Sequence, residues 1–218
     1  MGVIFDMDGV LVDSFEPHFL SWQQSARVWG LDMTKEQFTQ TFGRTSRDIA
    51  KTLWGDKLSN KDIIAFDMRK EQEYRKIIRD DFPAMPGAPE LITQLCESGF
   101  KLAIGSSGPA ENVELVLECL KARDKFCATV NGSEVRHGKP DPDVFLIAAD
   151  KMGLAPNRCC VVEDAPAGVQ AAKSAHMAVV AITGTVDKSQ LVDADMVIES
   201  LQELTPQIIT SLIEAKRE

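Results

Sequence analysis

The chain has 218 residues, of which 44% are hydrophobic and 26% are charged, and its formal net charge is −9. This length suits one domain, or one domain with a smaller insertion. The composition is that of a globular protein and excludes a disordered or collagen-like chain. Because the chain is acidic, we expect it to bind neither nucleic acid nor anionic membrane surfaces.

The cysteines and the apolar runs indicate the cellular compartment. The five cysteines are an odd number and lack C-x-x-C spacing, so they indicate neither a disulfide framework nor a zinc site. No apolar run of the sequence approaches the ~20 residues that span a bilayer, and the first residues do not have the pattern of a signal peptide. We therefore expect a cytoplasmic protein without membrane contact, and nothing in the sequence requires more than a monomer.

Short runs of β-branched and apolar residues alternate with helical patterns over most of the chain. The expected strands are residues 3–5, 102–104, 128–130, 160–162, 178–182 and 196–198. The expected helices between and after them are residues 88–98, 110–121, 142–152, 166–176 and 202–216. Because apolar strands that alternate with helices are typical of a parallel sheet covered on both faces, the pattern predicts a Rossmann-like, doubly wound α/β domain.

The stretch between the first and second strands interrupts this alternation, because it contains no convincing strand. Phe19 and Trp22 begin an apolar stripe with helical spacing. Further helical patterns cover residues 34–41, 46–53 and 60–80. This stretch is too long for a simple crossover connection. We therefore expect an all-helical inserted domain of residues 15–85, within a core domain formed by residues 1–14 and 86–218.

Polar side chains follow each of the first four expected strands. They are Asp6 and Asp8 after the first strand, Ser106 and Ser107 after the second, Lys139 after the third, and Glu163 and Asp164 after the fourth. Each residue alone is more often a helix cap, a turn residue or a solvated charge. In open α/β sheets, however, ligands bind at the carboxyl ends of the strands. The ordered set therefore predicts a functional site at this edge of the sheet.

The acidic residues of this set have the chemistry of a magnesium site. Asp6, Asp8 and Asp164 offer hard oxygen ligands, which Mg²⁺ prefers. A bound cation would relieve the repulsion between the carboxylates. Asp6 could then attack phosphorus as a nucleophile, as the aspartyl-phosphate enzymes do. Asp8 could act as the general acid and base, first on the leaving oxygen and then on water.

The remaining polar residues complete a phosphoryl-transfer site. Lys139 would offset charge on the nucleophile and on the phosphoryl group. The hydroxyl of Ser106 and the backbone N–H groups around Ser107 would bind the phosphoryl oxygens. The sequence has neither a G-x-x-x-x-G-K-[ST] loop nor a G-x-G-x-x-G motif after a strand, which disfavours the common nucleotide-binding folds.

Four segments resemble, in order, the four motifs of the haloacid dehalogenase superfamily. They are Phe5-Asp6-Met7-Asp8-Gly9 with the following residues to Ser14, the strand end at Ser106, Gly138-Lys139-Pro140, and Glu163-Asp164-Ala165-Pro166. The resemblance implies a magnesium-dependent enzyme in which Asp6 is the nucleophile and Asp8 the acid and base. It also implies that Mg²⁺ binds to the carboxylates of Asp6 and Asp164 and to the backbone carbonyl of Asp8. Glu163 would be an outer partner or an occasional ligand.

Within the superfamily, the chain is most similar to β-phosphoglucomutase and related sugar-phosphate phosphatases. The helical insertion resembles the family's cap domain of the first class. His18, Ser46-Arg47 and Lys70 resemble residues of that cap. The resemblance implies that His18, Arg47 and Lys70 contact the substrate.

Two departures from the mutase pattern favour hydrolysis. In the cap, the mutase pattern is Lys-Gly-Val-Ser-Arg, and this chain has Gly43 in place of the lysine, with Arg44 as a candidate substitute. After Ser107, the mutase pattern is Ser-Lys-Asn, and this chain has Gly108-Pro109-Ala110. A mutase must retain a bisphosphate and rebind it the other way round, whereas a phosphatase needs one productive pose. We therefore expect hydrolysis of a small phosphorylated metabolite, in particular a sugar phosphate.

Two alternatives remain beside this expectation. The first is β-phosphoglucomutase activity, which interconverts β-glucose 1-phosphate and glucose 6-phosphate. The second is a receiver-like signalling domain that only accepts phosphate on an aspartate. The helical insertion after the first strand disfavours a receiver, because receivers are smaller single domains.

Overall fold

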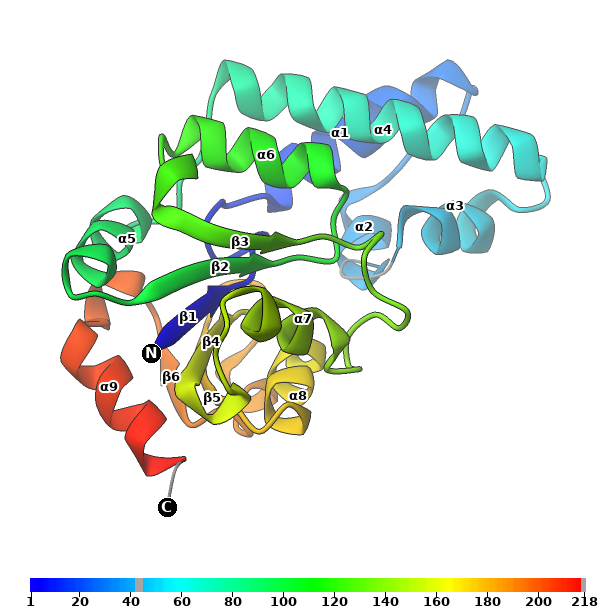
Figure 1. Cartoon of the computed structure of the whole chain (residues 1–218). Helices are drawn as coiled ribbons and strands as arrows, with labels where there is room; N and C mark the ends of the chain where they lie inside the picture. Colours follow the sequence, from blue (N-terminus) through cyan, green and yellow to red (C-terminus); the bar gives the residue numbers. More distant parts are fainter. Residues whose placement is uncertain (42–44, 217–218) are drawn as a thin grey trace. The chain divides into compact units, whose positions relative to one another are not determined.

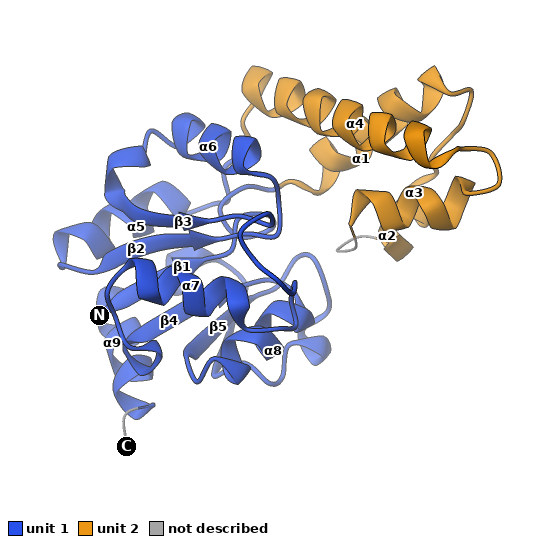
Figure 2. Cartoon of the chain, turned by 45° about the vertical axis from the view of Figure 1, so that its right-hand side comes forward, with its two compact units in different colours: residues 1–13, 83–218 blue, residues 14–82 orange. Residues whose placement is uncertain are grey.

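The computed structural model describes residues 1–41 and 45–216. The chain divides into a core unit, Met1–Asp13 with Pro83–Glu218, and a helical unit, Ser14–Phe82 (Figure 2). No helix in the described residues is both long and apolar enough to cross a membrane.

Backbone hydrogen bonds join the two segments that connect the units, and these bonds place the boundary between the units. The backbone N–H of Asp13 donates to the carbonyl of Pro83 at 2.9 Å, and that of Met85 donates to the carbonyl of Leu11 at 3.1 Å. Residues 83–85 are thereby tied to the core unit. The sequence-based division instead grouped these residues with the helices.

The core unit contains a six-stranded sheet in the order β3-β2-β1-β4-β5-β6 (Figure 1). The strands are β1 (Gly2–Phe5), β2 (Lys101–Gly105), β3 (Phe126–Val130), β4 (Cys159–Glu163), β5 (Ala178–Ile182) and β6 (Met196–Ile198). Every neighbouring pair is parallel. The order reverses at β1, which lies between β2 and β4. This arrangement confirms the predicted doubly wound α/β fold.

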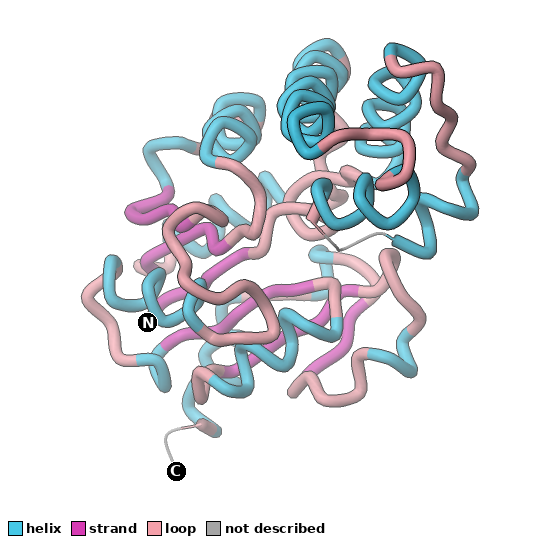
Figure 3. Tube along the Cα trace, turned by 90° about the vertical axis from the view of Figure 1, so that its right-hand side faces the viewer, coloured by secondary structure: helices cyan, strands magenta, loops and turns pink. Residues whose placement is uncertain are grey.

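Helices cover both faces of this sheet. Their bounds are α5 (Ala88–Glu97), α6 (Ala110–Cys119), α7 (Asp143–Lys151), α8 (Pro166–Ser174) and α9 (Pro206–Ala215). Helix α7 packs on β1, β2 and β3, and α8 packs beside it on β4 and β5. Helix α5 contacts β2, and α9 contacts β4 and β5, from the other face of the sheet (Figure 1). Figure 3 shows loops joining the strands to the helices at both ends of the sheet.

The predicted last helix, residues 202–216, begins too early. Leu201–Glu203 form a single 3-10 turn, and α9 begins at Pro206. Thr205 precedes this proline, which disfavours helical backbone at Thr205. The Thr205 hydroxyl instead accepts the backbone N–H of Ile208 at 3.3 Å and caps the helix.

The helical unit has its own aromatic core. It consists of α1 (Phe15–Val28), α2 (Lys35–Thr41), α3 (Ser46–Trp54) and α4 (Asn60–Asp80). The ring of Trp22 lies 5.0 Å from that of Phe66 and 5.8 Å from that of Trp54, between centroids. Each of these rings is at least 95% buried. The apolar stripe predicted from the sequence is therefore the face of α1 that packs against α3 and α4.

Phe145 of α7 connects the core to the carboxyl edge of the sheet. It is completely buried and belongs to the same hydrophobic cluster as Ile4 and Val130. A Cβ added to Gly105 would lie 3.1 Å from its ring, so the end of β2 is closely packed on this side chain. The ammonium group of Lys139 lies 5.0 Å from the centre of the same ring.

Replacing Phe145 with alanine would remove a buried ring from this tightly packed position. We expect the free energy of unfolding to fall by about 3–5 kcal/mol for Phe145→Ala, measured by urea denaturation. The neighbouring residue Leu146 is 37% exposed on the same helix. We expect Leu146→Ala to cost about 1 kcal/mol or less. Equal costs for the two variants would contradict this packing.

Candidate active site

Asp6 lies directly after β1, at the carboxyl edge of the sheet. Its backbone N–H donates to the carbonyl of Val162 at 2.9 Å, which continues the pairing of β1 with β4. The next residues turn sharply, and the N–H of Gly9 donates to the carbonyl of Val12 at 2.9 Å. Gly9 has a φ of +74°, which other residues adopt only with strain. The turn therefore holds Asp6 in place, with its side chain buried.

Lys139 joins Asp6 to Glu163. Its Nζ lies 2.6 Å from Oδ1 of Asp6 and 2.5 Å from Oε1 of Glu163. Burial alone would lower the pKa of Lys139, but the two carboxylates raise it above its ordinary value. The lysine is therefore held protonated, and one cation bridges the loops that follow β1 and β4.

Glu163 is fixed by both of its oxygens. Its Oε1 accepts from Lys139, and its Oε2 accepts the backbone N–H groups of Asp164 and Ala165 at 2.7 Å each. These two N–H groups lie at the start of α8, where the helix dipole favours a negative charge. Since both oxygens are engaged within the protein, the geometry favours an outer role for Glu163 over direct metal binding.

Asp164 completes a group of three buried carboxylates. Ligand oxygens of Asp6, Glu163 and Asp164 all lie within 4.8 Å of one another. The hydroxyl of Thr185 donates to Oδ2 of Asp164. A Cβ on Gly9 would lie 1.9 Å from this Oδ2, so only glycine fits beside it.

With all three carboxylates ionised, the group would carry more negative charge than its one lysine can balance. Burial raises the pKa of Asp6 to about 7, with Glu163 and Asp8 adding to the rise and Lys139 opposing it. Burial also raises the pKa of Asp164 well above its ordinary value. Three buried carboxylates with one ammonium group therefore fit an additional divalent cation, since hard oxygen donors are the ligands that Mg²⁺ prefers.

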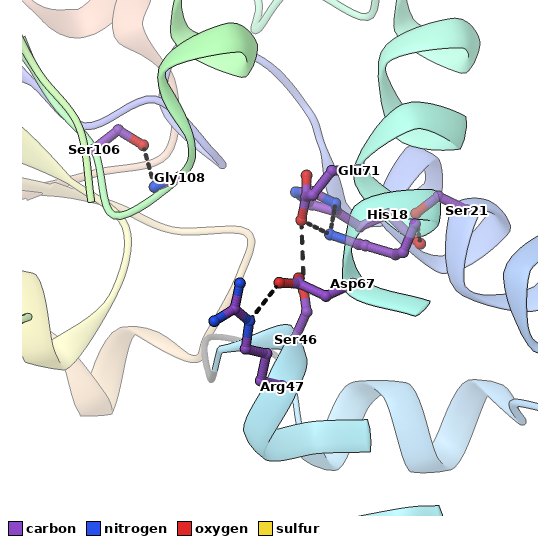
Figure 4. A network of polar contacts seen from close by, with 9 residues as sticks. His18, Ser21, Ser46, Arg47, Asp67, Glu71, Ser106 and Gly108 are labelled. Carbon is purple, nitrogen blue, oxygen red and sulfur yellow. Dashed lines mark hydrogen bonds and ion pairs between the residues drawn. The ribbon is translucent and has the colours of Figure 1, made fainter. Parts of the chain in front are cut away.

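Asp8 and Ser106 belong to adjoining loops of the same edge. The N–H of Gly108 donates to Oγ of Ser106 at 2.9 Å (Figure 4). A Cβ on Gly108 would lie 3.2 Å from this Oγ and 3.9 Å from Oδ2 of Asp8. Ser107 is exposed beside them. The structure thus gathers the core residues predicted from the sequence at one edge of the sheet.

The helical unit holds the three remaining predicted residues. The Nζ of Lys70 lies 3.0 Å from Nδ1 of His18 and donates to Glu71 at 2.8 Å. Arg47 forms an ion pair of 2.7 Å with Asp67 (Figure 4). The His18 ring stacks on Tyr74, with ring centroids 3.9 Å apart. Both predicted cations therefore have carboxylate partners within this unit.

The candidate substitute for the missing mutase lysine, Arg44, lies outside the described residues. Ser46, which follows it closely, places its hydroxyl 3.5 Å from Glu71 (Figure 4).

A second cluster of possible metal ligands lies on the loop before α7. The Nδ1 of His137 is 4.0 Å from Asp141 and 3.9 Å from Asp143. Asp143 accepts the backbone N–H groups of Arg136 and His137, and Asp141 accepts that of Asp143. We therefore assign these carboxylates to the structure of the loop.

Sequence reasoning missed Thr185 and the tight fit at Gly168. Thr185 follows β5, so the same strand-end rule that selected the other residues applies to it. A Cβ on Gly168 would lie 1.8 Å from Oε1 of Glu163. No local pattern in the sequence shows that close approach, because it depends on how α8 packs against the end of β4.

Comparisons with known proteins agree with this geometry. The family model of haloacid dehalogenase-like hydrolases matches residues 1–176. β-Phosphoglucomutase of Bacillus subtilis is 31% identical over 95% of this chain and 92% of its own length. Hexitol phosphatase A of Escherichia coli is 34% identical over 94% of this chain and 93% of its own.

Solved structures show the same likeness in three dimensions. The crystal structure of β-phosphoglucomutase from Clostridium difficile superposes with a TM-score of 0.85 at 25% identity. The match covers 98% of this chain and 97% of that one. The similarity therefore extends over both units and not only over the sheet.

The fit of Gly168 against Glu163 predicts an unusual effect of substitution. Alanine inside a helix is normally about 0.5–1 kcal/mol more favourable than glycine. At position 168 its Cβ would displace the Glu163 carboxylate from Lys139. We expect Gly168→Ala to lower the free energy of unfolding by about 1–3 kcal/mol in urea denaturation.

Gln170 is exposed on the same helix and provides the matched control. Gln170→Ala is expected to leave the free energy of unfolding within about 0.5 kcal/mol of the wild-type value. If Gly168→Ala were more stable than the wild type, the Glu163 carboxylate would not need the space that the absent Cβ of Gly168 leaves.

Proposed function

We propose that this chain, which belongs to the haloacid dehalogenase-like hydrolase family, is a Mg²⁺-dependent phosphatase of small phosphate monoesters, in particular sugar phosphates. The family and the relatives establish an enzyme that hydrolyses phosphate esters. The observation that carries the finer proposal is the buried group in which Lys139 bridges Asp6 and Glu163 beside Asp164.

The residues that would hold the metal are the carboxylates of Asp6 and Asp164 and the backbone carbonyl of Asp8. The surplus of buried negative charge supports this assignment. When bound, Mg²⁺ would supply positive charge to the carboxylates and to the phosphoryl oxygens. Glu163 is already engaged by Lys139 and two backbone N–H groups, so it would orient the lysine.

In the first step, a carboxylate oxygen of Asp6 attacks phosphorus. A bond between Asp6 and phosphorus forms, and the bond between phosphorus and the ester oxygen breaks. Asp8 gives its proton to the departing oxygen, so the product leaves as an alcohol. Lys139 fixes the Asp6 carboxylate by the 2.6 Å contact and offsets its charge.

In the second step, water attacks the phosphorus of the aspartyl phosphate. Asp8 accepts a proton from this water, the Asp6 carboxylate departs, and inorganic phosphate is released. Ser106 would donate its hydroxyl to a phosphoryl oxygen, while its Oγ accepts the N–H of Gly108. The backbone at Ser107, on the exposed side of that turn, would supply a further N–H group.

The charge balance within the helical unit supports a phosphatase over a mutase. A mutase must bind a second phosphate group, which needs cations that are available to it. Among the predicted cap cations that the structure describes, Arg47 is paired with Asp67 and Lys70 with Glu71, so the charge of these two side chains is offset locally. The similarity to β-phosphoglucomutase of Bacillus subtilis keeps mutase activity as the second candidate. The proposal requires no partner beyond the small phosphorylated substrate, and the chain would act as a monomer.

The nucleophile and the metal can be tested together on p-nitrophenyl phosphate. We expect Asp6→Asn to lower kcat by more than about 10³-fold, because the amide cannot form the phosphoenzyme. Chelation of divalent cations should abolish turnover, and added Mg²⁺ should restore it. Asp13→Asn, at an exposed aspartate of the same segment, is the control and should keep wild-type activity. Turnover by Asp6→Asn, or in the presence of chelator, would contradict the mechanism.

The choice between phosphatase and mutase can be tested with β-glucose 1-phosphate and a bisphosphate primer. The proposal predicts release of free phosphate, because the paired cations of the helical unit hold a second phosphate poorly. Product analysis by coupled phosphate and glucose 6-phosphate assays separates the outcomes. Accumulation of glucose 6-phosphate without phosphate release would establish the mutase instead.

A further inference from the structure

We propose that Thr185 is a positioning residue that holds Asp164 as a metal ligand, which makes the loop after β5 a fifth segment of the active site. This inference rests on the proposed magnesium site. It concerns a residue outside the four motif segments, in a loop that begins where β5 ends at Ile182.

Each carboxylate of the buried group accepts at least one hydrogen bond from within the protein. Asp6 receives a hydrogen bond from Lys139, and Glu163 receives hydrogen bonds from Lys139 and from two backbone N–H groups. Asp164 receives its hydrogen bond from the hydroxyl of Thr185, on Oδ2. Since Asp164 is 95% buried, the direction of its carboxylate depends on this neighbour.

The turn after β1 packs against both Asp164 and Thr185. A Cβ on Gly9 would lie 1.9 Å from Oδ2 of Asp164 and 2.8 Å from Oγ1 of Thr185. Gly9 directly follows Asp8, whose carbonyl is a proposed ligand. The Thr185–Asp164 pair is therefore packed against the Gly9 backbone, next to the proposed carbonyl ligand of Asp8. The loops after β1, β4 and β5 meet at this point.

The hydroxyl has two physical consequences for a cation site. By engaging Oδ2, Thr185 fixes the rotation of the Asp164 carboxylate and thereby the direction of its other oxygen, Oδ1. A donor to the carboxylate also offsets part of the repulsion from Asp6 and Glu163. Groups that orient metal ligands in this way typically contribute 10- to 100-fold in metal affinity.

The experiment measures Mn²⁺ binding to the purified full chain by electron paramagnetic resonance, with no substrate present. Thr185→Val keeps the branched shape and removes the hydroxyl, and we expect Mn²⁺ to bind about 10- to 100-fold more weakly. Thr185→Ser restores the hydroxyl, and its affinity should return to near the wild-type value. Thr183→Val, a matched change in the same loop, should leave the affinity unchanged.

Activity provides the second readout. For Thr185→Val, the Mg²⁺ concentration that gives half-maximal turnover should rise by the same factor, whereas kcat at saturating Mg²⁺ should stay near the wild-type value. Wild-type affinity in Thr185→Val would overturn the inference, as would a loss of stability without a loss of Mn²⁺ affinity. Absence of Mn²⁺ binding by the wild-type chain would instead overturn the proposed metal site itself.

Discussion

The bridge from Lys139 to Asp6 and Glu163 is the contact on which the candidate site depends. Three carboxylates lie within 4.8 Å of one another in a buried position, where their mutual repulsion is poorly screened. The lysine neutralises one of these charges and ties the loops after β1 and β4 together. The remaining negative charge is what makes a divalent cation fit this site. With a divalent cation bound, the site would hold enough positive charge to accept an anionic substrate, although the chain as a whole is acidic.

The fold brings these groups together through its strand order. The strands β1 and β4 are neighbours where the order of the sheet reverses, and parallel pairing brings their carboxyl ends to the same edge. Close packing then sets the details. Phe145 lies beneath the ammonium of Lys139, and two glycines, Gly9 and Gly168, leave room for the carboxylates of Asp164 and Glu163. The site thus depends on residues without chemical function as well as on charged ones.

Much of this arrangement could be predicted from the sequence, because the signals are local and periodic. Apolar strand runs and helical stripes gave the alternation of the core, and the rule that ligands bind at strand ends selected Asp6 and Lys139 among others. The start of α9 was wrong by four residues, since the apolar pattern of 202–216 outweighed the effect of Pro206. The start of a helix depends on one capping interaction, which periodicity does not report.

The missed residue, Thr185, illustrates a different limit. The strand-end rule applies to the loop that contains Thr185, but it does not distinguish this threonine from its neighbours. The contact of Thr185 with Asp164, beside Gly9, depends on tertiary packing. The pairing of Arg47 with Asp67 was likewise hidden, because the two residues lie 20 positions apart on different helices. Such contacts are determined by tertiary packing rather than by sequence spacing.

The proposed mechanism requires that Asp6 becomes covalently phosphorylated. The most direct measurement is a rapid acid quench of the enzyme during turnover of a phosphate monoester, followed by mass spectrometry of the peptide that contains Asp6 and Asp8. We expect the mass of one phosphoryl group on Asp6 in the wild-type chain and its absence in Asp6→Asn. A phosphoryl group on another residue, or rapid turnover by direct attack of water with no modified peptide at any quench time, would contradict it.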